Sequence, residues 1–253
     1  MKYQIKYLVY RAIEFLFKAI FQNWKVFYAW YLNRQDKNKS AISLKKLGKL
    51  KFKKGFDKGL YDTSMGDYHK QFLVKKGLKR DSLIFDLGFG FGRTAIPLIK
   101  FLDKGKYIGS EISSERHRIA MEWLEIENLK SKDPKLVIDI SNKFAFIENH
   151  SLDFVWAQSV FTHLPKNEAI EILEALKDKL KKKGQIIFNF SLSDNKSYKR
   201  TSIKDFSYST DYVTKTCEMI GYHVRILDDW QMELDPRSRA KHNLMLRLTK
   251  SGK

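Results

Sequence analysis

A turn of alternating glycines constrains the fold of this chain more than any other feature of its sequence. The turn reads DLGFGFGR, runs from Asp86 to Arg93, and ends an apolar stretch at residues 82–88. Glycines at alternate positions let the backbone bend sharply and approach a ligand closely. A strand that ends in such a turn and leads into a helix, here predicted over 93–102, is typical of the ligand-binding edge of an α/β sheet.

Strands and helices alternate after this turn. The predicted strands cover 82–88, 106–113, 135–140, 151–159, 185–191, 222–230 and 242–250, and the helices that follow the first cover 114–129, 166–184 and 209–220. Such alternation predicts an α/β fold of the Rossmann-like, doubly wound type. We expect a mostly parallel seven-stranded sheet with helices on both faces, together with an N-terminal amphipathic helix.

Polar residues follow the ends of four of these strands. Asp86 opens the glycine turn, Glu111 ends the second strand, Asp139-Ile140 ends the third, and Gln158 follows the fourth. The carboxyl ends of parallel strands meet at one edge of a sheet, so these residues are expected to converge. A carboxylate at Glu111 can accept the hydroxyls of a ribose, and Asp139 is placed to meet an adenine. The G-x-G-x-G spacing differs from the G-x-G-x-x-G of nucleotide-binding oxidoreductases, and an acid before it suits an ammonium group better than a pyrophosphate.

These stretches resemble the class I S-adenosylmethionine-dependent methyltransferases, in particular the small-molecule type with a DxGxGxGR loop. The resemblance extends over residues 61–253 and is carried by FDLGFGFGRTAIPL, YIGSEISSERHRIA, LVIDI, LDFVWAQSVFTHLP and LKDKLKKKGQIIFNF. It implies S-adenosyl-L-methionine as cofactor and the cofactor-binding residues Asp86, Gly88, Gly90, Gly92, Glu111, Ile112, Asp139, Ile140 and Gln158. The loop would hold the methionine portion, the second strand the ribose, the third the adenine, and the fourth the methyl end. Phe89 and Phe91 depart from the small residues often found in this loop.

Two features that the sequence lacks narrow the class of methyl acceptor. Amino-group methylation of a nucleobase or glutamine typically uses an Asn/Asp-Pro-Pro-aromatic turn after the fourth strand, and AQSVFTHLP contains none. Cytosine C5 methylation needs a cysteine nucleophile, and the single cysteine, Cys217, lies in a predicted helix. We therefore expect a small-molecule, glycan or lipid-linked acceptor with a reactive hydroxyl, and no metal. The alternatives are an RNA or other nucleic-acid methyltransferase and a Rossmann-like oxidoreductase.

His163 is the candidate general base for a hydroxyl acceptor, although a histidine at this place in the family is often structural. Several further side chains occupy predicted loops near the strand ends and are candidates for an acceptor pocket. They are Asp194, Tyr198, Arg200, Tyr208, Arg237 and Arg239.

An apolar arm precedes the catalytic region. Residues 3–32 contain no proline or glycine and predict one long helix, whose polar residues fall within an arc of about 80°. These polar residues are Gln4, Arg11, Glu14, Lys18, Gln22 and Lys25. The helix must bury most of its circumference, either on the catalytic domain or a second subunit, or in a membrane interface. The membrane alternative places Trp24, Phe27, Tyr28, Trp30 and Tyr31 at headgroup depth. Charged residues interrupt every window of about 18 apolar residues, which disfavours a bilayer span.

Basic residues are concentrated in the same part of the chain. The net charge is +19, and residues 1–60 hold fifteen Lys/Arg against three acids. We divide the chain into the helical arm 1–32, a basic linker 33–60 and the catalytic domain 61–253. A lone cysteine fits a reducing compartment, and no cleaved signal peptide is expected. The expected location is cytoplasmic, with peripheral contact to anionic membrane through residues 3–58; a homo-oligomer is a further possibility.

Overall fold

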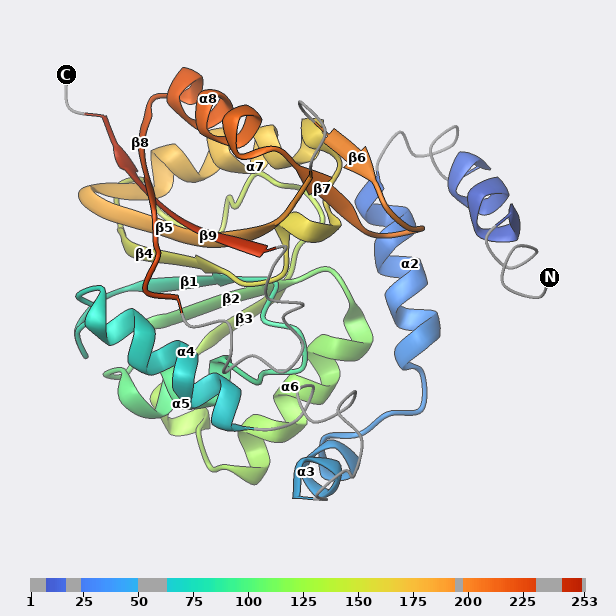
Figure 1. Ribbon diagram of the computed structural model, residues 1–253. Helices are drawn as coiled ribbons and strands as arrows, with labels where there is room; N and C mark the ends of the chain where they lie inside the picture. The colour runs from blue at the N-terminus through green and yellow to red at the C-terminus, as the bar shows by residue number, and fades with distance from the viewer. Residues whose placement is uncertain (1–7, 17–23, 50–62, 194–197, 231–242, 252–253) are drawn as a thin grey trace.

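The computed structural model describes residues 8–16, 24–49, 63–193, 198–230 and 243–251. Over this part the chain forms a nine-stranded sheet with helices on both faces (Figure 1). The strand order is β3-β2-β1-β4-β5-β7-β6, and β9 pairs with both β5 and β8. The mostly parallel α/β sheet predicted from the sequence is confirmed.

The strands are β1 (Ile84–Leu87), β2 (Tyr107–Glu111), β3 (Lys135–Ile138), β4 (Leu152–Ala157), β5 (Leu180–Leu192), β6 (Tyr198–Arg200), β7 (Phe206–Tyr208), β8 (Tyr222–Ile226) and β9 (Asn243–Lys250). The helices are α2 (Trp24–Asp36), α3 (Ala41–Lys49), α4 (Thr63–Lys75), α5 (Ala95–Phe101), α6 (Ser114–Ile126), α7 (Lys166–Lys179) and α8 (Thr210–Ile220), with short 3₁₀ turns at Lys130–Lys132 and Phe161–His163. Residues 8–16 form a further helix before α2.

The expected number of strands was too low. The two additional strands, β6 and β7, pair antiparallel with each other, and β7 pairs parallel with the end of β5. Each has three residues, which is too short for an alternating pattern to stand out in the sequence. This β6–β7 hairpin lies at the edge of the sheet where the site is built.

The end of α7 also differs from the expectation. The helix was predicted to continue to residue 184, but it ends at Lys179, and β5 begins at Leu180. Leu180 pairs with Leu152 of β4, so Lys181–Lys183 belong to the extended strand. The register between β4 and β5 is irregular at this point. Other predicted boundaries are close, and Ser113 caps α6 by accepting a hydrogen bond from the Arg116 N–H at 3.2 Å.

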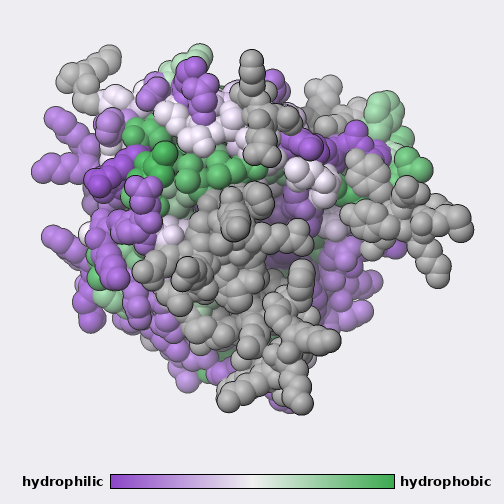
Figure 2. Space-filling model, viewed as in Figure 1, coloured by the Kyte–Doolittle hydropathy of each residue, from purple (hydrophilic) through white to green (hydrophobic). Residues whose placement is uncertain are grey.

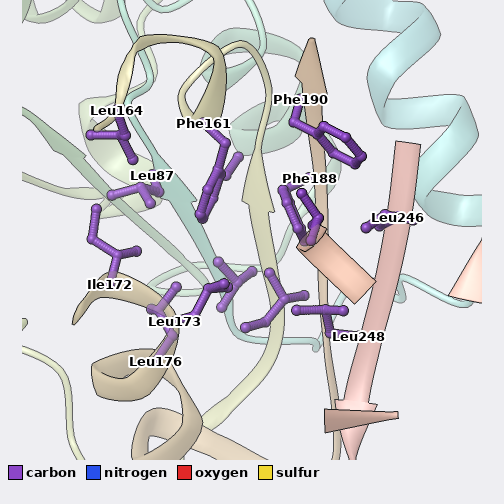
Figure 3. Close-up of a cluster of buried hydrophobic side chains, with 14 of the residues drawn as sticks. Leu87, Phe161, Leu164, Ile172, Leu173, Leu176, Phe188, Phe190, Leu246 and Leu248 are labelled. Carbon is purple, nitrogen blue, oxygen red and sulfur yellow. The ribbon is translucent and has the colours of Figure 1, made fainter. Parts of the chain in front are cut away.

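Two hydrophobic clusters hold the layers together. Ile84, Phe154 and Ile187 point from the sheet toward α3, α4, α5 and α6, where one cluster forms. The alternate residues of the same strands point to the other face, where α7, α8 and α2 complete the second cluster. Figure 3 shows leucines of α7 packed beneath phenylalanines of β5 and leucines of β9 in this second cluster. The sheet is therefore covered on both faces, and its carboxyl edge is left for a ligand.

Helix α2 packs on the α/β domain. Trp24, Phe27 and Tyr28 are buried in the second cluster, and the Trp24 Nε1–H donates to the backbone oxygen of His163 at 3.1 Å. Asn33 Oδ1 accepts hydrogen bonds from the Ser113 hydroxyl at 2.7 Å and from the Glu115 N–H at 3.2 Å, at the start of α6. The expectation that these aromatic residues lie at headgroup depth is wrong for the three buried ones.

The predicted polar stripe of the arm does not face water as a whole. Glu14 and Lys25 are buried; Glu14 pairs with Arg200, and Lys25 lies within the electrostatic reach of Glu168 and Asp139. Helix α2 also crosses the boundary placed at residue 32, and α3 lies within the predicted linker, where Lys45 pairs with Glu127 at 2.6 Å. The continuity of the arm through 17–23 and the lysines of 50–58 lie outside the described residues. Within the described part, no helix is long and apolar enough to cross a bilayer.

Candidate functional site

The glycine turn after β1 has the backbone that its sequence predicts. Gly88, Gly90 and Gly92 all have positive φ angles, of 73°, 59° and 94°. A Cβ at Gly88 would lie 2.6 Å from Val160 Cγ2, so a side chain there would collide with the loop after β4. Phe89 packs over Gly109, the strand residue without a side chain, which explains how the turn accommodates a bulky residue. The turn therefore exposes backbone at the strand ends.

Asp86 is a buried carboxylate at the start of this turn. Its Oδ2 accepts a hydrogen bond from the Tyr107 hydroxyl at 2.7 Å. Burial raises the pKa of Asp86 from 3.8 to about 7, and the hydrogen bond from Tyr107 and the charge of Arg93 only partly oppose this. A carboxylate with so little solvation is strongly stabilised by a cationic ligand, because the ligand replaces the charge partner that water would supply.

Glu111 is held rigidly by backbone donors. Its Oε1 accepts the N–H groups of Ile112 at 2.9 Å and Ser113 at 3.1 Å. Its Oε2 accepts the N–H of Gly90 at 2.9 Å, which joins the glycine turn to the end of β2. A carboxylate offers about four acceptor positions. Three are used here, so Oε2 has room for one more donor rather than for both hydroxyls of a ribose.

Asp139, at the end of β3, has one oxygen engaged and one available. Its Oδ1 accepts from the backbone N–H and the hydroxyl of Ser141 at 2.9 and 2.7 Å. Its Oδ2 is buried and has no hydrogen-bond partner among the described residues. A buried oxygen in this condition is costly unless a ligand donates to it. Ile140 is 41% exposed and lines neither of the cavities described next, in contrast to Ile112.

Two adjoining cavities lie along these strand ends. The smaller, of about 80 Å³, is lined by Glu111, Ile112 and Asp139. The larger, of about 810 Å³, is lined by Asp86 and Gln158 together with the glycine turn. Gly92 lines neither cavity and instead lies against Ala120 of α6. The structure thus brings together seven of the nine expected cofactor residues, while Gly92 and Ile140 stand outside the cavity walls.

Helix α2 supplies a wall that sequence reasoning missed. Tyr28 and Leu32 line both cavities, and Tyr31 and Gln35 line the larger one. These side chains recur at helical spacing in the sequence, but nothing in that spacing shows which surface they face. Lys25, on the same helix, lines the smaller cavity, where burial lowers its pKa against the opposing charges of Glu168 and Asp139.

His163 lies where the two cavities meet. Its Nδ1 is 2.9 Å from Asp205 Oδ1 and 3.2 Å from the Lys204 carbonyl oxygen. Because both neighbours are acceptors, the proton belongs on Nδ1 and the lone pair on Nε2. Burial lowers the pKa of His163 below 6.5, against the opposing effect of Asp205. Burial alone would raise the pKa of Asp205, but hydrogen bonding to His163 and the charge of Lys204 bring it below its usual value.

The candidate acceptor residues require correction. Tyr198, Arg200 and Tyr208 do not line either cavity. Tyr208 donates its hydroxyl to the Leu164 carbonyl, and Arg200 pairs with Glu14. Asp194, Arg237 and Arg239 lie outside the described residues. The cavity wall is instead formed by Thr201, Lys204, Asp205 and Ser207 around the β6–β7 hairpin, whose two short strands gave no sequence signal.

The comparisons with known proteins agree with this geometry. Residues 84–184 match the family model described as a methyltransferase domain. A magnesium protoporphyrin IX methyltransferase from Synechocystis PCC 6803, solved with bound S-adenosylmethionine, superposes with a TM-score of 0.64 at 16% identity, over 90% of this chain and 97% of that chain. An S-adenosylmethionine-dependent methyltransferase from Aquifex aeolicus gives 0.54 at 19% identity, over 83% and 98%. The glycopeptide N-methyltransferase MtfA gives 0.59 at 13% identity, over 74% and 93%.

The structural likeness at these identities shows the fold, and the family match identifies residues 84–184 as a methyltransferase domain. The matched domain makes the chain a methyltransferase, which agrees with its resemblance in sequence to the class I S-adenosylmethionine-dependent enzymes. Its cofactor is S-adenosylmethionine, and the site fits that molecule on two observations of its own. The unpartnered Asp139 Oδ2 can accept an amine, and the poorly solvated Asp86 suits an ammonium group. The oxidoreductase alternative is set aside.

Proposed function

We propose that this enzyme transfers the methyl group to a hydroxyl of a small-molecule, glycan or lipid-linked acceptor. The observation that carries the proposal is the pairing of His163 with Asp205 at the meeting point of the two cavities. A neutral imidazole with its proton fixed on Nδ1 offers Nε2 as a base. A hydroxyl needs such a base because it must lose its proton as the new bond forms.

The cofactor roles follow the cavity walls. We assign the adenosine portion to the smaller cavity, with Asp139 Oδ2 accepting the adenine amine, Ile112 against the ring and Glu111 Oε2 accepting one ribose hydroxyl. The methionine portion is assigned to Asp86 and the exposed backbone at Gly88 and Gly90. Gln158 lines the larger cavity at the methyl end. Gly92 acts through the shape of the turn, and Ile140 has no direct role in this assignment.

The bound cofactor supplies an electrophilic methyl group. The protein aligns the acceptor, excludes water and takes the proton at His163 Nε2, while Asp205 holds the ring in the required tautomer. The acceptor end of the larger cavity is lined by Thr201, Ser207 and Asn189, which can hydrogen-bond hydroxyl groups. These groups suit a hydroxylated acceptor, and the missing Pro-Pro turn is the feature that disfavours the amino group of a nucleobase.

The test is to incubate the purified protein with radiolabelled S-adenosylmethionine and separate lipid, glycan, small-molecule, protein and RNA fractions. We expect label in the lipid, glycan or small-molecule fraction. His163→Ala should label that fraction about 100-fold more slowly, the usual scale for loss of a general base. Binding of S-adenosylhomocysteine, measured by titration calorimetry, should persist in this variant.

His223→Ala is the matched control, because His223 is an exposed histidine on β8 away from both cavities. It should label at the wild-type rate. Label recovered mainly in RNA would overturn the acceptor class. An unchanged rate in His163→Ala would overturn the base while leaving the methyltransferase activity in place.

A further inference from the structure

The helix at residues 8–16 is anchored to the protein through one face. Tyr10 packs edge-on against Tyr31 and Trp30 of α2, with ring centroids 5.1 and 6.2 Å apart, and its hydroxyl oxygen accepts a hydrogen bond from Gln35 at 3.3 Å. Glu14 is buried on the same face, 2.8 Å from Arg200 of β6. The inward face therefore contains the one acidic residue among residues 8–16.

The opposite face of this helix is apolar and faces outward. Leu8 is 65% exposed, Phe15 72% and Leu16 56%. Together with the exposed Ala12, these residues fall within an arc of about 100° at the helical period. Val9 borders the arc and is 52% exposed. A surface helix in water normally buries its apolar face and exposes its charged face. This helix does the reverse, which indicates that its apolar outer face has a partner.

The exposure is concentrated rather than scattered. Ten large hydrophobic side chains in the described residues are strongly exposed, and four of them lie within residues 8–16. Figure 2 shows the corresponding hydrophobic side chains at the outer edge of the molecule, over the helix that Figure 1 places outside α2. Single exposed hydrophobic residues are ordinary, whereas a contiguous group of them marks a contact surface.

We propose that this outward face, Leu8, Val9, Ala12, Phe15 and Leu16, docks on an anionic lipid surface. The charged side chains around it support lipid over a second copy of the chain. Arg11 lies at one edge of the face with its side chain 45% exposed. Two further exposed cations lie on the elements that hold the helix: Arg34, over the Trp30 ring, and Lys199, next to Arg200. Apolar side chains bordered by cations match the acyl boundary and headgroups of an anionic bilayer, whereas two copies meeting here would bring like charges together.

Arg200 connects the helix that carries the docking face to the wall of the larger cavity. Arg200 holds Glu14 and stacks over Trp24 and Phe206, at 5.0 and 5.4 Å from the ring centroids. The next residue, Thr201, lines the larger cavity. Docking would therefore bring the cavity wall near the lipid surface, and, resting on the proposed function, the acceptor would be presented from that surface.

The test is flotation of the full chain with vesicles of phosphatidylcholine and phosphatidylglycerol in equal parts. The wild-type protein should float with these vesicles, float less with phosphatidylcholine alone and be partly released at high salt. The double variant Phe15→Ser/Leu16→Ser should partition at least about tenfold less, because two large apolar side chains no longer enter the acyl boundary. Its binding of S-adenosylhomocysteine should be unchanged, so loss of docking is separable from loss of the methyltransferase site.

Met219→Ser/Ile226→Ser is the matched control, because it removes two exposed apolar side chains from α8 and β8 and should float like the wild type. Equal flotation of the wild type and the Phe15/Leu16 variant would overturn the proposal, as would failure of the wild type to float. A wild-type dimer in light scattering that the Phe15/Leu16 substitutions convert to a monomer would assign the face to a second copy instead.

Discussion

At the scale of single residues, Asp86 is the residue whose ionisation most directly affects binding of a cationic ligand. Its carboxylate is buried beside Tyr107, and its pKa of about 7 means that near neutral pH it is only partly ionised in the free protein. The protonated form contributes stability that is complete below the ordinary pKa of 3.8 and is lost as the pH rises through about 7. A cationic ligand has the opposite preference, because it binds the ionised form.

This opposition predicts the pH dependence of cofactor binding. We expect the Kd for S-adenosylhomocysteine to be nearly constant above pH 8 and to rise by up to about tenfold per pH unit below 7, as Asp86 takes up a proton. Titration calorimetry between pH 5.5 and pH 8.5, an interval chosen about the pKa of Asp86, measures it. Asp86→Asn should bind more weakly and lose this slope. A wild-type Kd that does not change with pH would mean that the ammonium group is held elsewhere.

At the scale of elements, what the sequence could predict depended on where each element's partners lie. The strands β1 to β5 follow from short apolar runs, of which β1 is buried along its whole length, and helices α6 to α8 follow from apolar residues at the helical period. The convergence of Asp86, Glu111 and Asp139 followed from parallel topology alone. The placement of α2 could not be read in this way. Lys25 is buried within the electrostatic reach of Glu168, Asp139 and other acids far along the chain, and no pattern within the arm indicates those neighbours.

Helix α2 should therefore behave as part of the folding unit rather than as a separable arm. Phe27 is fully buried in the cluster beneath α7 and α8, so Phe27→Ala should lower the free energy of unfolding by about 3–5 kcal/mol. Phe15→Ala is the control from the same part of the chain, and because Phe15 is 72% exposed it should change stability by less than about 0.5 kcal/mol. Urea denaturation followed by tryptophan fluorescence compares them. Equal, small effects of both substitutions would show that the arm folds apart from the domain.

At the scale of the whole molecule, the proposed cofactor site joins two parts of the chain that lie apart in the sequence. These parts are residues 1–60, with a net charge of +12, and residues 61–253, with a net charge of +7. Tyr28 and Leu32 of α2 share the cavity walls with the glycine turn and the β3 end. The polar contacts of Asn33 and the ion pair of Asp36 with Arg116, at 2.8 Å, fasten the same helix to α6. A fragment that begins at Gly59 would lack one wall of the site, so we expect it not to bind the cofactor.

The last prediction concerns this coupling. A ligand that contacts both α2 and the glycine turn raises the free energy of opening either of them, by about 2.7 kcal/mol at a ligand concentration 100 times the Kd. Hydrogen exchange of amides in Trp24–Asp36 and in residues 88–94 should therefore slow by up to about 100-fold with S-adenosylhomocysteine, for openings that release the ligand. Amides of α8, which lines neither cavity of the site, serve as the internal control and should change much less. Protection confined to residues 88–94 would show that α2 opens without disturbing the bound cofactor, and the wall assigned to Tyr28 and Leu32 would then lie outside the binding site.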